Sequence, residues 1–283
     1  MNTDFLALRS QLSSLYAVGE ARAIAFLVFE EAFGVSRTDI YADKVRQFSA
    51  EEHKRLLNIS KQLSAGVPVQ YVLEKSQFFG HTFRVSPDVL IPRPETEELV
   101  AWAIDETQHM SIADNTLHLL DAGTGSGCIA ISLKLALPQA HVDAWDISEA
   151  ALAVARSNAQ AMQANVAFQH VDMLQPVSSL QRYHIIVSNP PYICQREEAE
   201  MEANVTEHEP HTALFVPDAD PLRFYRALCQ HATRLLQPGG CLMVEINRAY
   251  GQQTADLFRS YGLSDIMLRK DAFGNDRMLL GRI

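Results

Sequence analysis

The first third of the chain carries apolar residues at helical spacing. Apolar positions recur three or four residues apart over residues 5–16 and 20–33, and Gly34 follows the second segment as a helix stop. Residues 49–52 read Ser-Ala-Glu-Glu, a capping box that predicts a third helix to about Leu63. The pattern therefore predicts a small helical domain over residues 1–74.

Further along, short apolar runs alternate with amphipathic segments. Candidate strands cover residues 117–121, 141–145, 166–171, 184–188, 241–246, 264–269 and 277–283. Helical segments separate most of them, which predicts an α/β fold with a mostly parallel, doubly wound sheet. We expect this domain to span residues 98–283, joined to the helices by a β-hairpin linker over residues 75–97. Residues 195–211 are polar and rich in Glu, and we expect them to form a long loop.

Composition is that of a globular protein, with 283 residues, 47% hydrophobic and 20% charged. No run approaches the roughly 18 apolar residues of a membrane span. The start of the chain also lacks the features of a signal peptide, so we expect a cytoplasmic protein without a membrane segment. The four cysteines form no Cys-x-x-Cys pair, and no His/Cys cluster has ligand spacing, so we expect no metal site.

Charge is distributed unevenly between the two predicted domains. Residues 1–75 carry 9 Lys/Arg and 9 Asp/Glu, whereas residues 76–283 carry 15 and 25, so the second region holds the whole net charge of −10. Such a surface repels phosphates and attracts basic protein segments. A direct nucleic-acid partner is therefore not expected.

A glycine-rich turn follows the first strand of the predicted sheet. The strand ends at Asp121, residues 122–127 read Ala-Gly-Thr-Gly-Ser-Gly, and a helical segment follows. This is the nucleotide-binding context of an α/β sheet, but the spacing is neither that of a dinucleotide fingerprint nor that of a P-loop. A compact turn led by an acid suits S-adenosylmethionine, which has no phosphates; a purely structural turn is the alternative. The candidate cofactor residues are Gly123, Thr124, Gly125, Ser126 and Gly127.

Acidic residues stand at the ends of the next two strands. Asp146 follows the second strand, 23 residues after Gly123, where an acid is placed to bind ribose hydroxyls. Ser148 can cap the next helix, so we expect Asp146 to be free for a ligand. Asp172 and Met173 follow the third strand and are candidates for an adenine contact, with a plain surface turn as the alternative for Asp172.

The fourth strand runs into Asn189-Pro190-Pro191-Tyr192. The Asn189 side-chain oxygen and the Pro190 carbonyl can accept both N–H groups of a planar nitrogen, because the prolines fix φ and aim the carbonyls. The Tyr192 ring offers a face for stacking on a flat group. We therefore predict Asn189, Pro190 and Tyr192 as catalytic and residues 189–192 as substrate-binding, with Asn189 also near the cofactor. A Pro-rich turn that only ends the strand is the alternative.

These motifs together resemble the class I S-adenosylmethionine-dependent methyltransferases. Three further segments narrow the resemblance to the release factor glutamine methyltransferases, the PrmC/HemK family. They are Leu-Ile-Pro-Arg-Pro-Glu-Thr-Glu at residues 90–97, Glu-Pro-His-Thr-Ala-Leu at 209–214 and Gly-Asn-Asp-Arg at 274–277. Asn247, where we expect a glycine, and Met173, where some relatives carry an aromatic residue, depart from the family pattern.

The resemblance implies a Rossmann-like methyltransferase domain and a helical domain that helps to dock a release factor. It implies transfer of a methyl group from S-adenosylmethionine to the side-chain nitrogen of the glutamine in the Gly-Gly-Gln motif of class-1 peptide chain release factors. From the residues alone, the acceptor is only a planar amide or amine nitrogen. A nucleic-acid adenine N6-methyltransferase is the alternative, because such enzymes use a similar turn and flip a base into it. The acidic charge argues against it, and a non-catalytic protein that keeps the fold is a further alternative.

Overall fold

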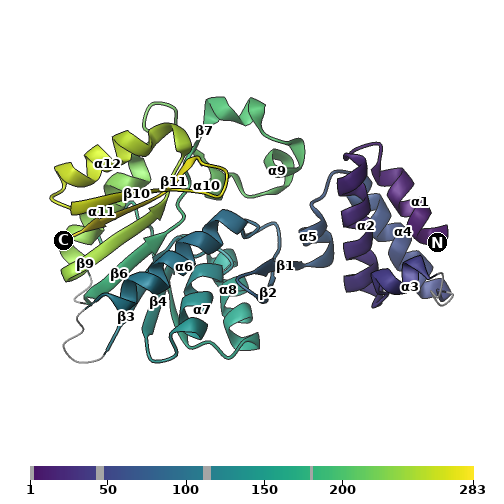
Figure 1. Cartoon of the computed structure of the whole chain (residues 1–283), viewed down its shortest axis with the longest axis horizontal. Helices are drawn as coiled ribbons and strands as arrows, with labels where there is room; N and C mark the ends of the chain where they lie inside the picture. The colour runs from purple at the N-terminus through teal and green to yellow at the C-terminus, as the bar shows by residue number, and fades with distance from the viewer. Residues whose placement is uncertain (1–2, 43–47, 111–115, 179–180) are drawn as a thin grey trace. The chain divides into compact units, whose positions relative to one another are not determined.

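The computed structural model describes residues 3–42, 48–110, 116–178 and 181–283, which divide into two compact units. The N-terminal unit comprises residues 1–75 together with 202–208, and the C-terminal unit comprises residues 76–201 and 209–283 (Figure 1). A short segment from late in the chain thus belongs to the N-terminal unit. The predicted boundaries at residues 74 and 97 do not anticipate that segment.

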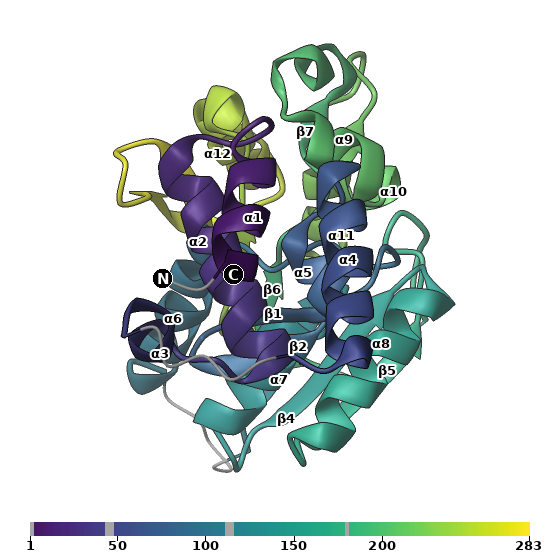
Figure 2. The ribbon, with the colours of Figure 1, turned by 90° about the vertical axis from the view of Figure 1, so that its right-hand side faces the viewer.

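The N-terminal unit is a bundle of helices around an aromatic core, and Figure 2 shows α1, α2 and α4 within it. Gly34 ends α2 in the left-handed conformation, and the Ser49–Glu52 capping box opens α4, so both predicted boundary signals are confirmed. The helices are α1 (Thr3–Leu12), α2 (Val18–Phe33), α3 (Arg37–Tyr41), α4 (Ala50–Ser64) and α5 (Val69–Leu73).

The C-terminal unit is built on a seven-stranded sheet in the order β10-β11-β9-β6-β3-β4-β5. Strands β5, β4, β3, β6 and β9 are parallel, and β11 and β10 close one edge in antiparallel pairing, so the predicted doubly wound sheet is confirmed. The strands are β3 (His118–Ala122), β4 (His141–Asp146), β5 (Val166–His170), β6 (Tyr183–Ser188), β9 (Leu236–Glu245), β10 (Ser264–Lys270) and β11 (Asp276–Arg282).

Alternation along the strands divides the core between the two faces of this sheet. Leu119 packs with residues of α6 and α7, whereas its neighbour Leu120 packs with residues of α11 and α12. Figure 1 shows these helices covering the sheet. The helices are α6 (Pro94–Gln108), α7 (Cys128–Ala136), α8 (Glu149–Ala161), α11 (Arg223–Leu235) and α12 (Gly251–Ser260), with a short η2 (Arg248–Tyr250).

Sheet order places a switch point between β3 and β6. The chain moves outward from β3 through β4 to β5, then returns to add β6 and β9 on the other side. Ligands of such sheets bind at the carboxyl ends of the strands near this point. The glycine turn after β3 and the Asn-Pro-Pro-Tyr turn after β6 both lie there.

Two smaller features depart from the sequence prediction. The predicted linker holds a hairpin of β1 (Lys75–Phe78) and β2 (His81–Arg84), but α6 already begins within it at Pro94. The expected long loop over residues 195–211 is wrong, because most of it forms short helices that satisfy its backbone groups locally. The segment contains η1 (Gln195–Glu200), α9 (Ala203–His208) and the start of α10 (His211–Leu214), and two short strands, β7 (Ile193–Cys194) and β8 (Phe215–Val216), flank it.

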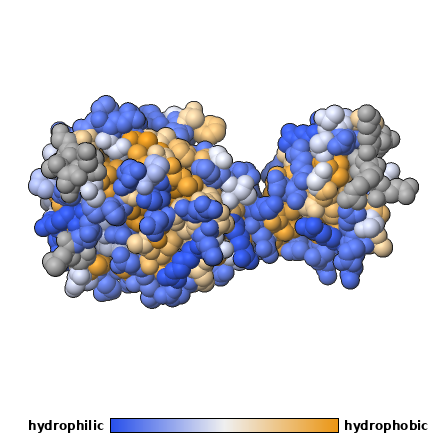
Figure 3. Space-filling model, turned by 90° about the horizontal axis from the view of Figure 1, so that it is seen from below, coloured by the Kyte–Doolittle hydropathy of each residue, from blue (hydrophilic) through white to orange (hydrophobic). Residues whose placement is uncertain are grey.

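Hydrophobic residues gather in a patch on the C-terminal unit in the face that Figure 3 shows, and hydrophilic residues surround it. Within the described ranges, no helix is both long and apolar enough to cross a membrane. The same residues contain no group of three or more His, Cys, Asp or Glu that could hold a metal ion.

Candidate active site

The glycine turn is anchored to the neighbouring strand by its own backbone. The amides of Gly123 and Thr124 both donate to the carbonyl oxygen of Trp145 in β4, at 2.8 and 2.9 Å. Gly123, Gly125 and Gly127 have φ values of +83°, +54° and +82°, which L side chains rarely adopt. These backbone conformations favour glycine, which lets the chain turn sharply between β3 and α7.

The glycines of this turn face different surroundings. A Cβ on Gly125 would meet no protein atom within 4 Å, so the backbone there is open to a ligand. A Cβ on Gly127 would lie 2.9 Å from Ile131 Cδ1 and 3.1 Å from Ala155 Cβ. Gly127 thus permits α7 and α8 to pack closely. It is not among the described residues that line the cavity at these strand ends.

Asp146 is not free in the way the sequence suggested. Its Oδ2 accepts the Gly125 amide at 2.8 Å and its Oδ1 accepts the Ser148 amide at 2.9 Å. The Ser148 hydroxyl caps α8 by accepting the Ala151 amide, so the predicted N-cap is confirmed. Burial raises the pKa of Asp146, and the backbone amides oppose that rise. Each carboxylate oxygen keeps a lone pair for a further donor, so Asp146 can hold the turn and still accept a hydroxyl.

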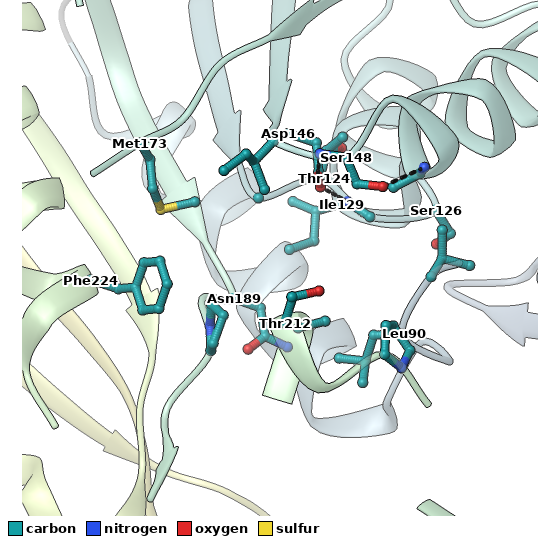
Figure 4. Close-up of a pocket in the computed structure, with 18 of the residues that line it drawn as sticks. Leu90, Thr124, Ser126, Ile129, Asp146, Ser148, Met173, Asn189, Thr212 and Phe224 are labelled. Carbon is teal, nitrogen blue, oxygen red and sulfur yellow. Dashed lines mark hydrogen bonds between the residues drawn. The ribbon is translucent and has the colours of Figure 1, made fainter. Parts of the chain in front are cut away.

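A cavity of about 330 Å³ opens at these strand ends, within the size range of small-ligand sites. Figure 4 shows Met173 and Phe224 on one side of it, Asp146 and Ser148 by the glycine turn, and Asn189 near Thr212. The predicted residues that line it are Gly123, Thr124, Gly125, Ser126, Asp146, Asp172, Met173, Asn189 and Pro191. The structure therefore brings most of the predicted cofactor residues together with Asn189.

Met173 and Asp172 form one wall of the cavity. Met173 is buried, and a Cβ on Gly123 would lie 3.0 Å from its Cε, so the glycine lets this side chain reach the turn. Asp172 Oδ1 accepts the Leu174 amide at 2.9 Å, which shapes the turn after β5. Asp172 thus contributes to the local turn and also faces the cavity.

Asn189 is held by side chains from distant parts of the chain. Its Nδ2 donates to the Thr96 hydroxyl oxygen at 3.0 Å, and that hydroxyl donates to Glu245 Oε2 at 2.7 Å. The Tyr192 hydroxyl donates to Glu245 Oε1 at 2.9 Å, so the same carboxylate fixes both ends of the turn. Among the described residues, Pro190 and Tyr192 do not line the cavity, since Pro190 is buried and the hydroxyl of Tyr192 is bound to Glu245.

Two of the segments that carry the sequence resemblance meet around a buried carboxylate. Glu209 accepts the Ile91 amide at 3.1 Å and pairs with Arg93 at 2.5 Å. This contact holds the segment before α6 against the segment before α10. Both segments contribute to the cavity, through Leu90, Pro92, Arg93, Pro210, Thr212 and Ala213.

Sequence reasoning missed several residues of the site. Glu245 stands at the carboxyl end of β9, so the strand-end rule that singled out Asp146 and Asp172 would also have found it. Phe224, from α11, carried no signal, because an aromatic residue in an amphipathic helix is typical of a core. Thr96 lies in the 90–97 segment that carries the family resemblance and lines the cavity as that segment suggested, but its hydrogen bond to Asn189, 93 residues away, had no counterpart in local pattern.

A fully buried acid lies beneath the glycine turn. Asp121 Oδ2 accepts the Thr124 hydroxyl at 2.6 Å and the Ala130 amide at 3.1 Å, while its Oδ1 has no hydrogen-bond partner among the described residues. Burial raises the pKa of Asp121 to about 7, against the effect of these two hydrogen bonds, and the negative charge of Asp146 raises it further. Asp121 therefore orders the turn at a cost in desolvation.

Comparison with known proteins shows which protein family this sequence resembles. The family described as PrmC N-terminal domain matches residues 7–73, and the family described as Methyltransferase small domain matches residues 107–209. A release factor glutamine methyltransferase of Bacteroides thetaiotaomicron is 46% identical over 281 residues, which cover 99% of both chains. This chain belongs to the release factor glutamine methyltransferase family.

Other relatives carry the same name at lower identity. The release factor glutamine methyltransferase of Flavobacterium psychrophilum is 42% identical over 95% of this chain and 94% of its own. That of Bacillus subtilis is 35% identical over 100% of this chain and 99% of its own. The family relationship therefore extends over both units of the chain.

Solved structures with similar folds are more distant in sequence. The hMettl16 catalytic domain, in complex with MAT2A 3′UTR hairpin 6, covers 84% of each chain at 16% identity with a TM-score of 0.56. The Thermus thermophilus 16S rRNA N2 G1207 methyltransferase, in complex with AdoMet and guanosine, covers 74% of this chain and 49% of its own at 18% identity with a TM-score of 0.52. At such identities the likeness shows a shared methyltransferase fold.

Proposed function

We propose that this member of the release factor glutamine methyltransferase family transfers a methyl group from S-adenosylmethionine to the glutamine side-chain nitrogen of the Gly-Gly-Gln motif in class-1 peptide chain release factors. The observation that carries the proposal is the state of Asn189. Its NH₂ group is engaged by Thr96, so its carbonyl oxygen is left for a donor in the cavity that also holds the glycine turn and Asp146.

The cavity fits S-adenosylmethionine in the character of its donors and acceptors. Gly125 exposes backbone with positive φ to open space, and Asp146 adds an anionic acceptor beside it. Met173 and Phe224 supply an apolar wall for a flat base. We assign cofactor binding to the turn residues 123–126 and to Asp146, Asp172 and Met173.

The chain's own residues act on the acceptor amide. An amide nitrogen is a poor nucleophile because its lone pair is delocalised. Asn189 Oδ1 is assigned to one of its N–H groups, and the Pro190 carbonyl is the predicted second acceptor, although Pro190 does not line the cavity in this structure. Acceptors on these N–H groups stabilise the positive charge that develops on nitrogen. When bound, S-adenosylmethionine would supply the methyl group, and its sulfur would take back the C–S electron pair as the N–C bond forms. The nitrogen then loses its extra proton to water, so no general base is required.

The same proposal implies that the protein partner is a release factor. A release factor substrate places the reaction in the cytoplasm, and we assign docking of the release factor to the helical unit of residues 1–74. The excess of Asp/Glu in residues 76–283 suits a basic protein segment rather than a polyphosphate. Pro191 and the ring of Tyr192 complete the assigned substrate site.

A labelling experiment tests this function. The purified protein is incubated with methyl-labelled S-adenosylmethionine and, separately, with a class-1 release factor, duplex DNA or ribosomal RNA, and the label is mapped by mass spectrometry. We expect label on the Gly-Gly-Gln glutamine and none on a release factor whose Gly-Gly-Gln glutamine is changed to alanine. Label on adenine with none on the release factor would overturn the proposal in favour of the nucleic-acid alternative.

A further inference from the structure

A buried carboxylate stands behind the group assigned to bind the substrate amide. Glu245, at the end of β9, is 1% exposed and is not among the described residues that line the cavity. Its two oxygens accept the hydroxyls of Thr96 and Tyr192, at 2.7 and 2.9 Å. Thr96 in turn accepts the Asn189 NH₂ group at 3.0 Å. A continuous chain of hydrogen bonds therefore joins β9 to Asn189 through α6.

The direction of each bond in this chain follows from the chemistry of its groups. An ionised carboxylate has no hydrogen to give, so both hydroxyls must donate to Glu245. Thr96 has a single hydroxyl hydrogen, and once Glu245 takes it, the Thr96 oxygen can only accept. Asn189 must therefore turn its NH₂ group toward Thr96, because a carbonyl oxygen there would face a second acceptor.

The surroundings of Glu245 work both for and against its charge. Burial raises the pKa of Glu245, while the two hydroxyl donors and the positive charge of Arg277 oppose that rise. Arg277 is itself held by Asp271 at 3.2 Å, in the turn between β10 and β11. The Gly-Asn-Asp-Arg segment of the sequence thus contributes a cation that favours the ionised carboxylate.

We propose that Glu245 is a positioning residue that sets the orientation of the Asn189 amide through Thr96, so that an acceptor rather than a donor is available to the substrate. The proposal rests on the assigned function, in which Asn189 Oδ1 accepts a substrate N–H. Glu245 touches neither substrate nor cofactor in this scheme. Its effect is to prevent a 180° turn of an amide whose two ends are nearly equal in shape.

The first test is Glu245→Gln. A glutamine can donate its NH₂ to Thr96, which frees the Thr96 hydrogen for the Asn189 carbonyl and lets Asn189 turn its NH₂ to the substrate. We expect kcat to fall about 100-fold, the scale of one lost preorganised acceptor. The Kd for S-adenosylmethionine and the Tm should stay close to wild type, which a general structural defect would not allow. Turnover close to wild type would overturn the proposal.

Glu106→Gln is the matched control. Glu106 is also a buried carboxylate, 5% exposed, and it accepts the Trp102 indole N–H at 2.9 Å and pairs with Arg282. It has no contact with Thr96 or Asn189 in the described structure, so its replacement should leave kcat unchanged. An equal loss of kcat in both variants would mean that buried charge in general, rather than the chain to Asn189, sustains turnover, and would also overturn the proposal.

A pair of variants at Thr96 decides the question if Glu245→Gln fails to fold. Thr96→Val keeps the shape and removes the hydroxyl, so the Asn189 amide loses its fixed partner and kcat should fall. Thr96→Ser restores the hydroxyl and should recover most of the lost rate. Equal kcat values for Val and Ser at this position would contradict the relay, that is, the chain of hydrogen bonds from Glu245 through Thr96 to Asn189.

Asn189→Ala separates this proposal from the function on which it rests. In that background, Glu245→Gln should cause no further loss of the residual rate, because the residue on which it acts is gone. A further loss as large as in the wild type would overturn the relay alone. If Asn189→Ala by itself methylates the release factor normally, the assigned acceptor role fails. If it is inactive while Glu245→Gln is fully active, only the relay fails.

Discussion

The two halves of the cavity are built by different means. The cofactor half is made of backbone: five residues between β3 and α7 form the turn, and Asp146 accepts one of its amides. The acceptor half is made of side chains, in which Asn189 reaches Thr96 across 93 residues and Thr96 reaches Glu245 across 149. A backbone turn is encoded locally, because it depends on which residues tolerate positive φ. Hydrogen bonds between side chains from distant segments form only once the whole sheet has formed.

Asn189→Ala should produce the largest effect and fall on the acceptor half alone. Without the amide oxygen, the substrate N–H loses an acceptor that strengthens as nitrogen gains charge, and we expect kcat to fall by at least ~100-fold. The Kd for S-adenosylmethionine should change little, as measured by calorimetry. A parallel loss of cofactor affinity would show that the two halves are not separable.

Asp146→Ala should act on the cofactor half. It removes the proposed ribose acceptor and also frees the Gly125 amide, so we expect the Kd for S-adenosylmethionine to rise about tenfold or more, as for one or two hydrogen bonds to a charged group. Glu149→Ala removes the same charge from the exposed start of α8 and is the control. An unchanged Kd in Asp146→Ala would remove Asp146 from the ribose.

A pair of glycine variants distinguishes ligand contact from packing within the turn. Gly127→Ala places a Cβ 2.9 Å from Ile131, so we expect a loss of stability of about 1–3 kcal/mol in denaturant unfolding. Gly125→Ala meets no protein atom within 4 Å, so it should lose only the stability that an alanine at positive φ costs, which is less than Gly127→Ala loses, and it should also raise the Kd for the cofactor. The reverse pattern, with Gly125→Ala the less stable variant, would contradict the separation of their roles.

The last prediction concerns Asp121 and the pH dependence of stability. Its pKa is about 7 in the folded protein against 3.8 for an aspartate side chain in water, so the folded state holds this proton more tightly. The contribution of Asp121 to stability therefore falls as pH rises from about 4 to about 7 and is constant above that. In Asp121→Asn this decline is absent, so the difference in Tm between variant and wild type should shift in favour of the variant across that window. A difference that does not change with pH would refute the shift.

Prediction from the sequence succeeded where neighbours in the chain decide the outcome. Hydrophobic period predicted the helices and the parallel strands, and the Ser49 and Ser148 caps lie where the pattern placed them. It failed over residues 195–211, where polar composition suggested a loop and the structure has short helices. Polarity alone does not distinguish exposed helices from loops, because both leave their side chains in water.

In the candidate site, too, prediction succeeded where neighbours in the chain decide the outcome and failed where distant residues do. Sequence order placed residues 123, 146, 172 and 189 at strand ends, and a parallel sheet must bring such ends to one edge. It misjudged Asp146, which seemed free once Ser148 was assigned as the cap but in fact accepts two amides. It also overlooked Glu245, which the strand-end rule would have found, although the hydrogen bonds that Glu245 accepts from Thr96 and Tyr192 are visible only in the tertiary structure.

By itself, the sequence determined the fold class, the edge of the sheet where ligands bind and the residue types that line it. These follow from hydrophobic periodicity, from glycine at positions of positive φ and from the rule that ligands bind at the carboxyl ends of parallel strands. Only the tertiary structure decided which way the Asn189 amide is held. That choice depends on Thr96 and Glu245, whose hydrogen bonds form when α6 and β9 pack beside the turn and exclude water from it.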